Sequence, residues 1–299
     1  MVYKMNFKQV LLITILFTIS SILMACIINQ HSKHQEIIPD SQFPFGKPLR
    51  ILRQQDRTPK KVFVLGVYAS AVHAIWFSPD GRVLCDALAV ASEPEIFWNG
   101  DNAAEIISKI NIPSEAGYLE PSLQMYNGSS GRALDELYLA PLGFSRTDAW
   151  LCDLVPHSFM NEKQSRAIKT HYIPIRGMFN LPTASIPEEP SVLIGDNRRL
   201  EIISELEESQ AEIIILLGDK PVKWFLSYVS DCYKTWLSEF GKDTETYGLL
   251  HSVIINGKVY QVLPLAHVRQ GGALGTHNDD WNQLHNNWVE NMNRKNHTK

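Results

Sequence analysis

Cysteine is scarce in this chain, and no two cysteines lie at metal-binding spacing. The chain contains four, separated by 59, 67 and 80 residues: Cys26, Cys85, Cys152 and Cys232. Without a Cys-x-x-Cys pair, neither a zinc knuckle nor a dense disulfide framework is expected. Four free thiols in a reducing compartment are the simplest interpretation.

An excess of positive charge is also missing. The 28 Lys and Arg residues stand against 32 Asp and Glu, which gives a net charge of −4. The chain therefore lacks the overall basic field by which many nucleic-acid-binding proteins attract phosphates, and any contact with DNA would depend on a local patch. Its 299 residues, 44% hydrophobic and 20% charged, suit one large globular domain or two small ones.

Several motifs of nucleotide and ester chemistry do not occur. There is no GxxxxGK[ST] and no GxSxG, and the glycine that follows Val64-Leu65 does not begin a GxGxxG. A P-loop nucleotidase, a hydrolase with a nucleophile elbow and a dinucleotide-binding domain are therefore disfavoured. Neither HExxH nor paired helical spacing occurs among the histidines His31, His34, His277 and His285. No metal and no cofactor is therefore expected.

One long uncharged run stands near the N-terminus. The 24 residues between Lys8 and Lys33 include no Asp, Glu, Lys or Arg, and about 20 apolar residues suffice to span a bilayer. Residues 10–28 are interpreted as an uncleaved membrane anchor or as a lipoprotein signal with the lipobox-like Leu23-Met24-Ala25-Cys26. Both imply a membrane-associated protein. A third interpretation, translation from Met24, implies a cytoplasmic one.

The rest of the chain divides by composition into a linker, a folded domain and a tail. The expected boundaries are a signal or anchor at 1–28, a polar linker at 29–60, an α/β domain at 61–289 and a flexible tail at 290–299.

The apolar patterns within the domain predict buried strands separated by helices. Strands are expected at residues 61–65, 148–155 and 211–217, and helices at 103–110, 134–139 and 222–228. Asn256-Gly257 between two β-rich segments predicts a hairpin. Strands that are apolar on both faces indicate a parallel sheet covered on both sides, and hence an α/β fold.

Four clusters follow the predicted strands, where ligands bind in open parallel sheets. They begin at Gly66, Asp153, Gly218 and His267, and we expect them to converge on one cleft. Gly66 would let the backbone approach a ligand, and a helix starting near Ser70 would present amide N–H groups to an anion.

Phe97 and Trp98 form an aromatic pair in a predicted loop. Core packing explains the pair as easily as stacking on an extruded base does.

Taken in order, these segments resemble the uracil-DNA glycosylase superfamily over roughly Val62 to Val289. Gly66 with Tyr68-Ala69-Ser70 is similar to its glycine-led first motif, and Glu95-Ile96-Phe97-Trp98 looks like the segment before a helix in the mismatch-specific branch. Leu263-Pro264-Leu265-Ala266-His267 corresponds to the strand that ends in the family's His-Pro-Ser. Two further segments match: Leu142 to Pro156, and Ile213 to Gly218.

The resemblance implies a three-layer α/β sandwich with a central parallel sheet, and base excision from DNA that carries a damaged base. His267 would donate a hydrogen bond to the departing base, Asp153 would help water, and Tyr68 or Phe97 would stack on the base. Glu93 or Glu95 is the second choice for the water. Substrate binding would fall to Gly66, Tyr68, Ser70, Phe97 and Arg269.

The sequence also departs from the family pattern. Val67, Tyr68 and Ala69 supply no acid in the first motif, Asp153 replaces an asparagine, and His267-Val268-Arg269-Gln270 lacks Pro-Ser. The alternative is a catalytically inactive module of the same fold that is tethered to a membrane and binds a nucleobase-like or other small ligand. Structural scaffolding is a third choice, and the oligomeric state stays open.

We predict that the native chain fractionates with membranes, because its uncharged segment can span a bilayer. Fractionation together with intact-mass analysis tests this. A soluble protein that begins at Met24 would contradict the anchor.

Overall fold

The computed structural model describes residues 36–269 and 275–297. The predicted anchor at 10–28 lies outside the described residues, as does the loop 270–274. Within the part of the chain that is described, no helix has the length and apolar character needed to cross a membrane.

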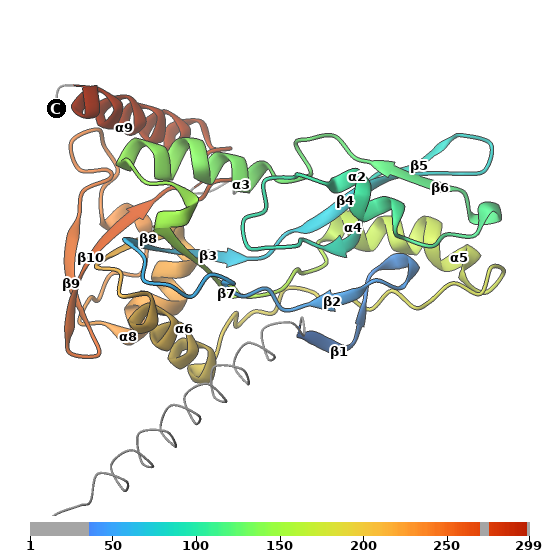
Figure 1. Ribbon diagram of the computed structural model, residues 1–299, viewed down its shortest axis with the longest axis horizontal. Helices are drawn as coiled ribbons and strands as arrows, with labels where there is room; N and C mark the ends of the chain where they lie inside the picture. Colours follow the sequence, from blue (N-terminus) through green and yellow to red (C-terminus); the bar gives the residue numbers. More distant parts are fainter. Residues whose placement is uncertain (1–35, 270–274, 298–299) are drawn as a thin grey trace, which may run out of the picture. The chain divides into compact units, whose positions relative to one another are not determined.

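Five strands form a mixed, mostly parallel sheet in the order β7-β3-β8-β10-β9 (Figure 1). The strands are β3 (Val62–Tyr68), β7 (Ala149–Val155), β8 (Ile213–Leu217), β9 (His251–Ile255) and β10 (Lys258–Leu265). All neighbours pair in parallel except β9, which is antiparallel to β10. The predicted α/β class and its three buried strands are confirmed.

Helices cover both faces of this sheet, which is why its strands are apolar on both sides. One face packs against α6 (Asp196–Ser209) and the helical run α7-η7-α8, which spans 219–229. The other packs against the run α3-η3-η4, which spans 129–142, and α9 (Asp279–His297). Figure 1 shows α3 and α9 together on one side and α6 and α8 on the other. The helices predicted at 134–139 and 222–228 are confirmed.

The predicted hairpin is present between β9 and β10. Asn256 has φ 48° and Gly257 has φ 77°. Two successive residues with positive φ form the turn that suits the twist of a two-residue hairpin, and Asn-Gly adopts it readily.

A second sheet interrupts the chain between β3 and β7. It is antiparallel, in the order β5-β4-β6, with β4 (Ala71–Phe77), β5 (Val83–Ser92) and β6 (Tyr118–Pro121). The helix expected near Ser70 is therefore wrong: β3 continues past Gly66, and only two residues separate its end from the start of β4. Residues 72–77 alternate between buried and half-buried, which is the period of a strand, and Trp76 is fully buried.

Short helices cover this second sheet and share a core with it. Ile107 of α2 (Ala103–Ser108) packs near Trp76, as do Ile168 and Tyr172 of the run α4-η6-α5, which spans 162–176. The predicted helix at 103–110 is confirmed as α2. The remaining short helical turns are η1 (Pro44–Gly46), η2 (Ser114–Ala116), η5 (Arg146–Asp148) and η8 (Leu237–Glu239).

The segment predicted as a linker is structured from Ile37 onward. β1 (Ile37–Gln42) pairs with β2 (Pro48–Arg50), and Phe43 and Leu49 are fully buried in a cluster with Ile186. The sequence shows no apolar period here because the partners that bury these side chains are distant in the chain.

The predicted flexible tail is also corrected, because α9 continues to His297. Trp281, His285 and Trp288 are separated by four and three residues, so they lie on one helical face, and all three are buried. Leu284, Val289 and Met292 pack against the same core, so this apolar face docks a helix whose other residues are polar.

Replacing Phe43 tests the packing of this segment. Phe43→Ala should lower the free energy of unfolding by about 3–5 kcal/mol, because it removes a fully buried aromatic ring. Ile37→Ala is the matched control, since Ile37 is 51% exposed and should change stability by at most about 0.5 kcal/mol. Denaturant titration measures both, and equal small effects would mean that residues 37–50 form a linker.

Candidate functional site

The strand register brings the four predicted clusters to one edge of the central sheet. Gly66 on β3 lies opposite Asp153 on β7, and Leu217 on β8 lies opposite Leu265 on β10. The N–H of Gly218 donates to the carbonyl of Leu265 at 2.8 Å. Because the four strands are parallel, their carboxyl ends align and the residues that follow them meet there.

At this edge of the sheet, neighbouring side chains pack directly against the backbone of Gly66. A Cβ at this position would lie 2.3 Å from Oδ1 of Asp153 and 2.6 Å from Cζ of Phe97. Both distances are too short for any side chain, so the two groups meet over bare backbone. Phe97 is 8% exposed and belongs to the core beneath α3, so it packs as a core residue and presents little face to a ligand.

Two carboxyl groups are buried at this edge, and we call Glu93 and Asp153 the carboxyl pair. They are 4% and 3% exposed. Glu93 accepts a hydrogen bond from the backbone N–H of Ser70. Within the described part of the chain no group donates a hydrogen bond to the Asp153 carboxylate.

Burial sets the protonation of the carboxyl pair. Desolvation raises the pKa of Asp153 to about 7, opposed by the charge of Arg198 and reinforced by that of Glu205. Desolvation, followed by repulsion from Asp153, raises the pKa of Glu93 well above its ordinary value. Asp153 therefore titrates near neutral pH, and for Glu93 the protonated form is favoured.

Arg198 on α6 fixes the end of β7 without pairing with the Asp153 side chain. It donates to the carbonyls of Asp153 at 2.7 Å and Leu154 at 3.0 Å. Its charge is balanced by Glu205 at 3.1 Å and Glu201 at 3.0 Å. The guanidinium thus anchors the main chain and leaves the Asp153 carboxyl free to titrate.

His267 follows β10 at the same edge. Its Nδ1 accepts a hydrogen bond from the backbone N–H of Arg269 at 3.2 Å, so in the neutral ring the proton lies on Nε2. Desolvation, followed by the charges of Lys220 and His277, lowers the pKa of His267 to about 4. At neutral pH His267 is a neutral imidazole with one N–H to donate.

A buried polar network holds the residue before His267. Tyr247 accepts from the N–H of Ala266 and Tyr138 donates to its carbonyl, both at 2.8 Å. His285 on α9 supports Tyr247 through Nδ1 at 2.8 Å and reaches the Leu137 carbonyl through Nε2 at 3.0 Å. A carbonyl only accepts, so Nε2 donates and Nδ1 accepts from the Tyr247 hydroxyl. Sequence reasoning gave His285 no role, although it lies within the predicted domain at 61–289; the spacing of Trp281 and Trp288 was the available signal.

Tyr68 is the exposed aromatic side chain of the edge, at 38%. Its ring packs edge-on against Phe159 at 5.3 Å, and the Lys220 ammonium lies 5.5 Å from its centroid. Lys220 also pairs with Glu189 at 2.5 Å. The Lys220 ammonium lies over the ring of Tyr68, and its charge lowers the pKa of His267. These two predicted residues therefore lie near the same cation.

The structure does not bring the side chains of the other predicted site residues together. Ser70 contributes its backbone, since its N–H binds Glu93 and its carbonyl accepts from Ser158. Arg269 is half-buried, and burial and the charge of Arg132 lower its pKa. Glu95 lies outside the carboxyl pair: its side chain is 54% exposed and 3.8 Å from Arg146.

No protein-family model matches this chain. No curated protein matches it significantly either. Residues 36–269 and 275–297 contain no group of three His, Cys, Asp or Glu side chains placed to hold a metal ion.

The raised pKa of Asp153 predicts a pH-dependent stability. The folded chain holds this proton to about pH 7, whereas the ordinary value is 3.8, so the contribution is fully present below pH 3.8 and is lost as the pH rises through 7. Asp153→Asn should flatten the stability curve over this range by about 4 kcal/mol. Denaturant titrations at several pH values measure this, with the exposed Glu95→Gln as control. Parallel stability curves for wild type and Asp153→Asn would contradict the raised pKa of Asp153.

Proposed function

We propose that this chain is a uracil-DNA glycosylase-like hydrolase that cleaves the N-glycosidic bond of a deoxynucleotide flipped out of DNA. The observation that carries the proposal is the buried carboxyl pair at the same sheet edge as the neutral His267. Helices on both faces of a mostly parallel sheet fit the three-layer arrangement of that superfamily, and the order of its motifs along the chain supports the same assignment.

Asp153 is the proposed general base. A base works best when its pKa lies near the operating pH, because it is then ionised and still accepts a proton readily. The pKa of Asp153, about 7, meets this condition. In the reaction a water oxygen attacks C1′ while the bond from C1′ to the base nitrogen breaks. The water proton passes to Asp153.

His267 is the proposed stabiliser of the leaving base. The electrons of the broken bond move onto the base, which becomes anionic. The Nε2–H of a neutral imidazole can donate a hydrogen bond to that anion. Because the pKa of His267 is about 4, the ring stays neutral at pH 7 and provides this donor without first losing a charge.

The carboxyl pair can also replace the asparagine with which the family contacts the base edge and which this sequence lacks. An amide presents a donor and an acceptor to a base edge, whereas an ionised Asp153 can only accept. Burial and the charge of Asp153 raise the pKa of Glu93, which favours its protonated form, and that form would supply the donor. Tyr68 is the proposed stacking residue, since it is exposed while Phe97 is buried.

A binding module without catalysis is the second candidate. Val67, Tyr68 and Ala69 supply no acid, and the raised pKa of Asp153, about 7, leaves part of this base protonated near neutral pH. In this case the carboxyl pair and Tyr68 would hold a nucleobase-like ligand without cleaving it, and residues 10–28 would tether the module to a membrane.

Excision assays on oligonucleotides that contain uracil, hypoxanthine or xanthine test the proposal. The wild-type rate should rise through an apparent pKa near 7 as Asp153 ionises. Asp153→Asn should lower it by about 10²- to 10⁴-fold, and His267→Ala by about 10²- to 10³-fold. Glu95→Gln is the control, because this exposed carboxylate lies outside the pair.

The outcomes separate the two candidates. Binding of free uracil that Asp153→Ala abolishes, without any excision by wild type, would support the binding module. Neither excision nor nucleobase binding would contradict both. Full excision by His267→Ala would remove only the role of that histidine.

A further inference from the structure

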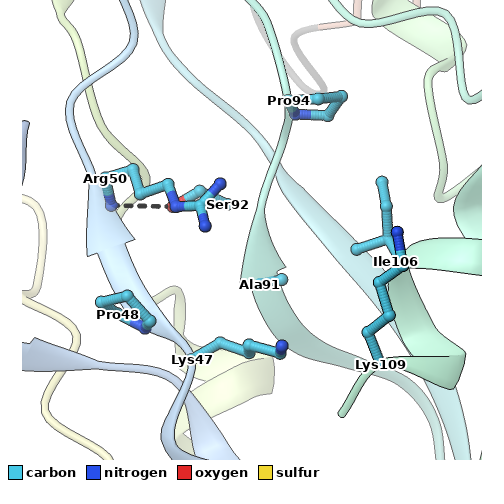
Figure 2. Close-up of a pocket in the computed structure, with 8 residues that line it drawn as sticks. All are labelled: Lys47, Pro48, Arg50, Ala91, Ser92, Pro94, Ile106 and Lys109. Carbon is cyan, nitrogen blue, oxygen red and sulfur yellow. Dashed lines mark hydrogen bonds between the residues drawn. The ribbon is translucent and has the colours of Figure 1, made fainter. Parts of the chain in front are cut away.

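A basic pocket lies between β2, the end of β5 and α2, apart from the carboxyl pair. Its volume is about 240 Å³, and it is lined by Lys47, Pro48, Arg50, Ala91, Ser92, Pro94, Ile106 and Lys109. Figure 2 shows Lys47 and Arg50 on one side, and Ile106 and Lys109 across from them. We propose that this pocket binds a phosphate group.

The charge of the lining is one-sided. The three cations come from two segments, Lys47 and Arg50 from the segment that contains β2 and Lys109 from the end of α2, and no Asp or Glu belongs to the lining. Lys109 pairs with Glu105 at 2.6 Å, at the exposed surface of α2. Lys47 and Arg50 form no ion pair with any residue in 36–269 or 275–297. Their charges are therefore available to an anion from outside.

The polar groups of the pocket are mainly donors. The backbone N–H of Arg50 donates to Oγ of Ser92 at 2.9 Å, shown as the dashed line in Figure 2. The Ser92 oxygen is thereby engaged as an acceptor, so its hydroxyl hydrogen is free to donate. The Arg50 guanidinium has no hydrogen-bond partner among the described residues, and its planar fork matches two oxygens of a phosphate.

The size and the walls of the pocket further restrict the class of ligand that it can bind. Pro48, Pro94 and Ile106 form apolar walls beside the cations, so the phosphate would carry an organic portion. At about 240 Å³ the space is below the usual range for whole drug-sized ligands. It suits one phosphate with its neighbouring group, from a nucleic-acid backbone or a small phosphorylated molecule.

This pocket is distinct from the carboxyl pair. Ser92 lines it, whereas Glu93, the next residue, belongs to the pair and forms no part of its lining. Phosphate binding therefore does not depend on base excision.

Fluorescence anisotropy and calorimetry on the full chain test the proposal with two probes, a labelled oligothymidylate and thymidine 5′-monophosphate. Lys47→Ala combined with Arg50→Ala should weaken binding of at least one probe about 10-fold or more, because two charge-assisted contacts are lost. The control combines Arg82→Ala with Lys242→Ala, which removes two exposed cations outside the pocket and should leave binding within about 2-fold of wild type.

The two probes distinguish the two sources of the phosphate, a nucleic-acid backbone and a small phosphorylated molecule. A loss with oligothymidylate, and a log–log salt slope shallower by about 0.7 per phosphate released, indicates a nucleic-acid backbone. A loss confined to the monophosphate indicates a small phosphorylated ligand. Arg50→Lys keeps the charge and removes the fork, so it should bind more weakly than wild type while folding normally. The proposal is overturned if wild type binds neither probe, or if the double variant binds like its control.

Discussion

Burial of the central sheet on both faces is the constraint from which the properties of the site follow. Helices exclude water from β3, β7, β8 and β10, so the groups that follow these strands lie at the margin of a dry interior. An ionised carboxylate or imidazolium there loses hydration without a counterion of its own. The same cause therefore moves the pKa of Asp153 upward and that of His267 downward. Each change brings its group toward the neutral form, and only Asp153 is left to titrate close to pH 7.

The second sheet determines which carboxyl group accompanies Asp153. β5 carries the chain back to the edge of the central sheet, and Glu93 is the residue directly after it. The N–H of Ser70, between β3 and β4, then holds the Glu93 carboxyl. One short connection thus joins the two sheets and positions half of the carboxyl pair. Gly66 completes the arrangement, because any side chain there would displace Asp153 or Phe97.

Buried neutral hydrogen bonds orient the opposite side of the site. Both backbone groups of Ala266 are bonded to tyrosine hydroxyls, and His285 supports one of these tyrosines from α9. Desolvation lowers the pKa of His285 to about 4, so this network stays uncharged in the range where Asp153 titrates. The geometry of His267 can thus remain constant while the charge of the carboxyl pair changes.

The sequence by itself determined the α/β class, the buried strands and the Asn256-Gly257 hairpin, because apolar periodicity and turn chemistry are local properties. It also placed Gly66, Asp153 and His267 near the carboxyl ends of their strands, which parallel strands bring together. Only the tertiary structure decided that Glu93 is buried beside Asp153 while Glu95 is exposed, because two residues so close in the chain are separated by packing against distant partners. The tail at 290–299 was wrong because α9, which packs through Trp281 and Trp288 against distant residues, continues to His297. The linker was wrong for the same reason: Phe43 is buried by residues far along the chain, and no local pattern records those contacts.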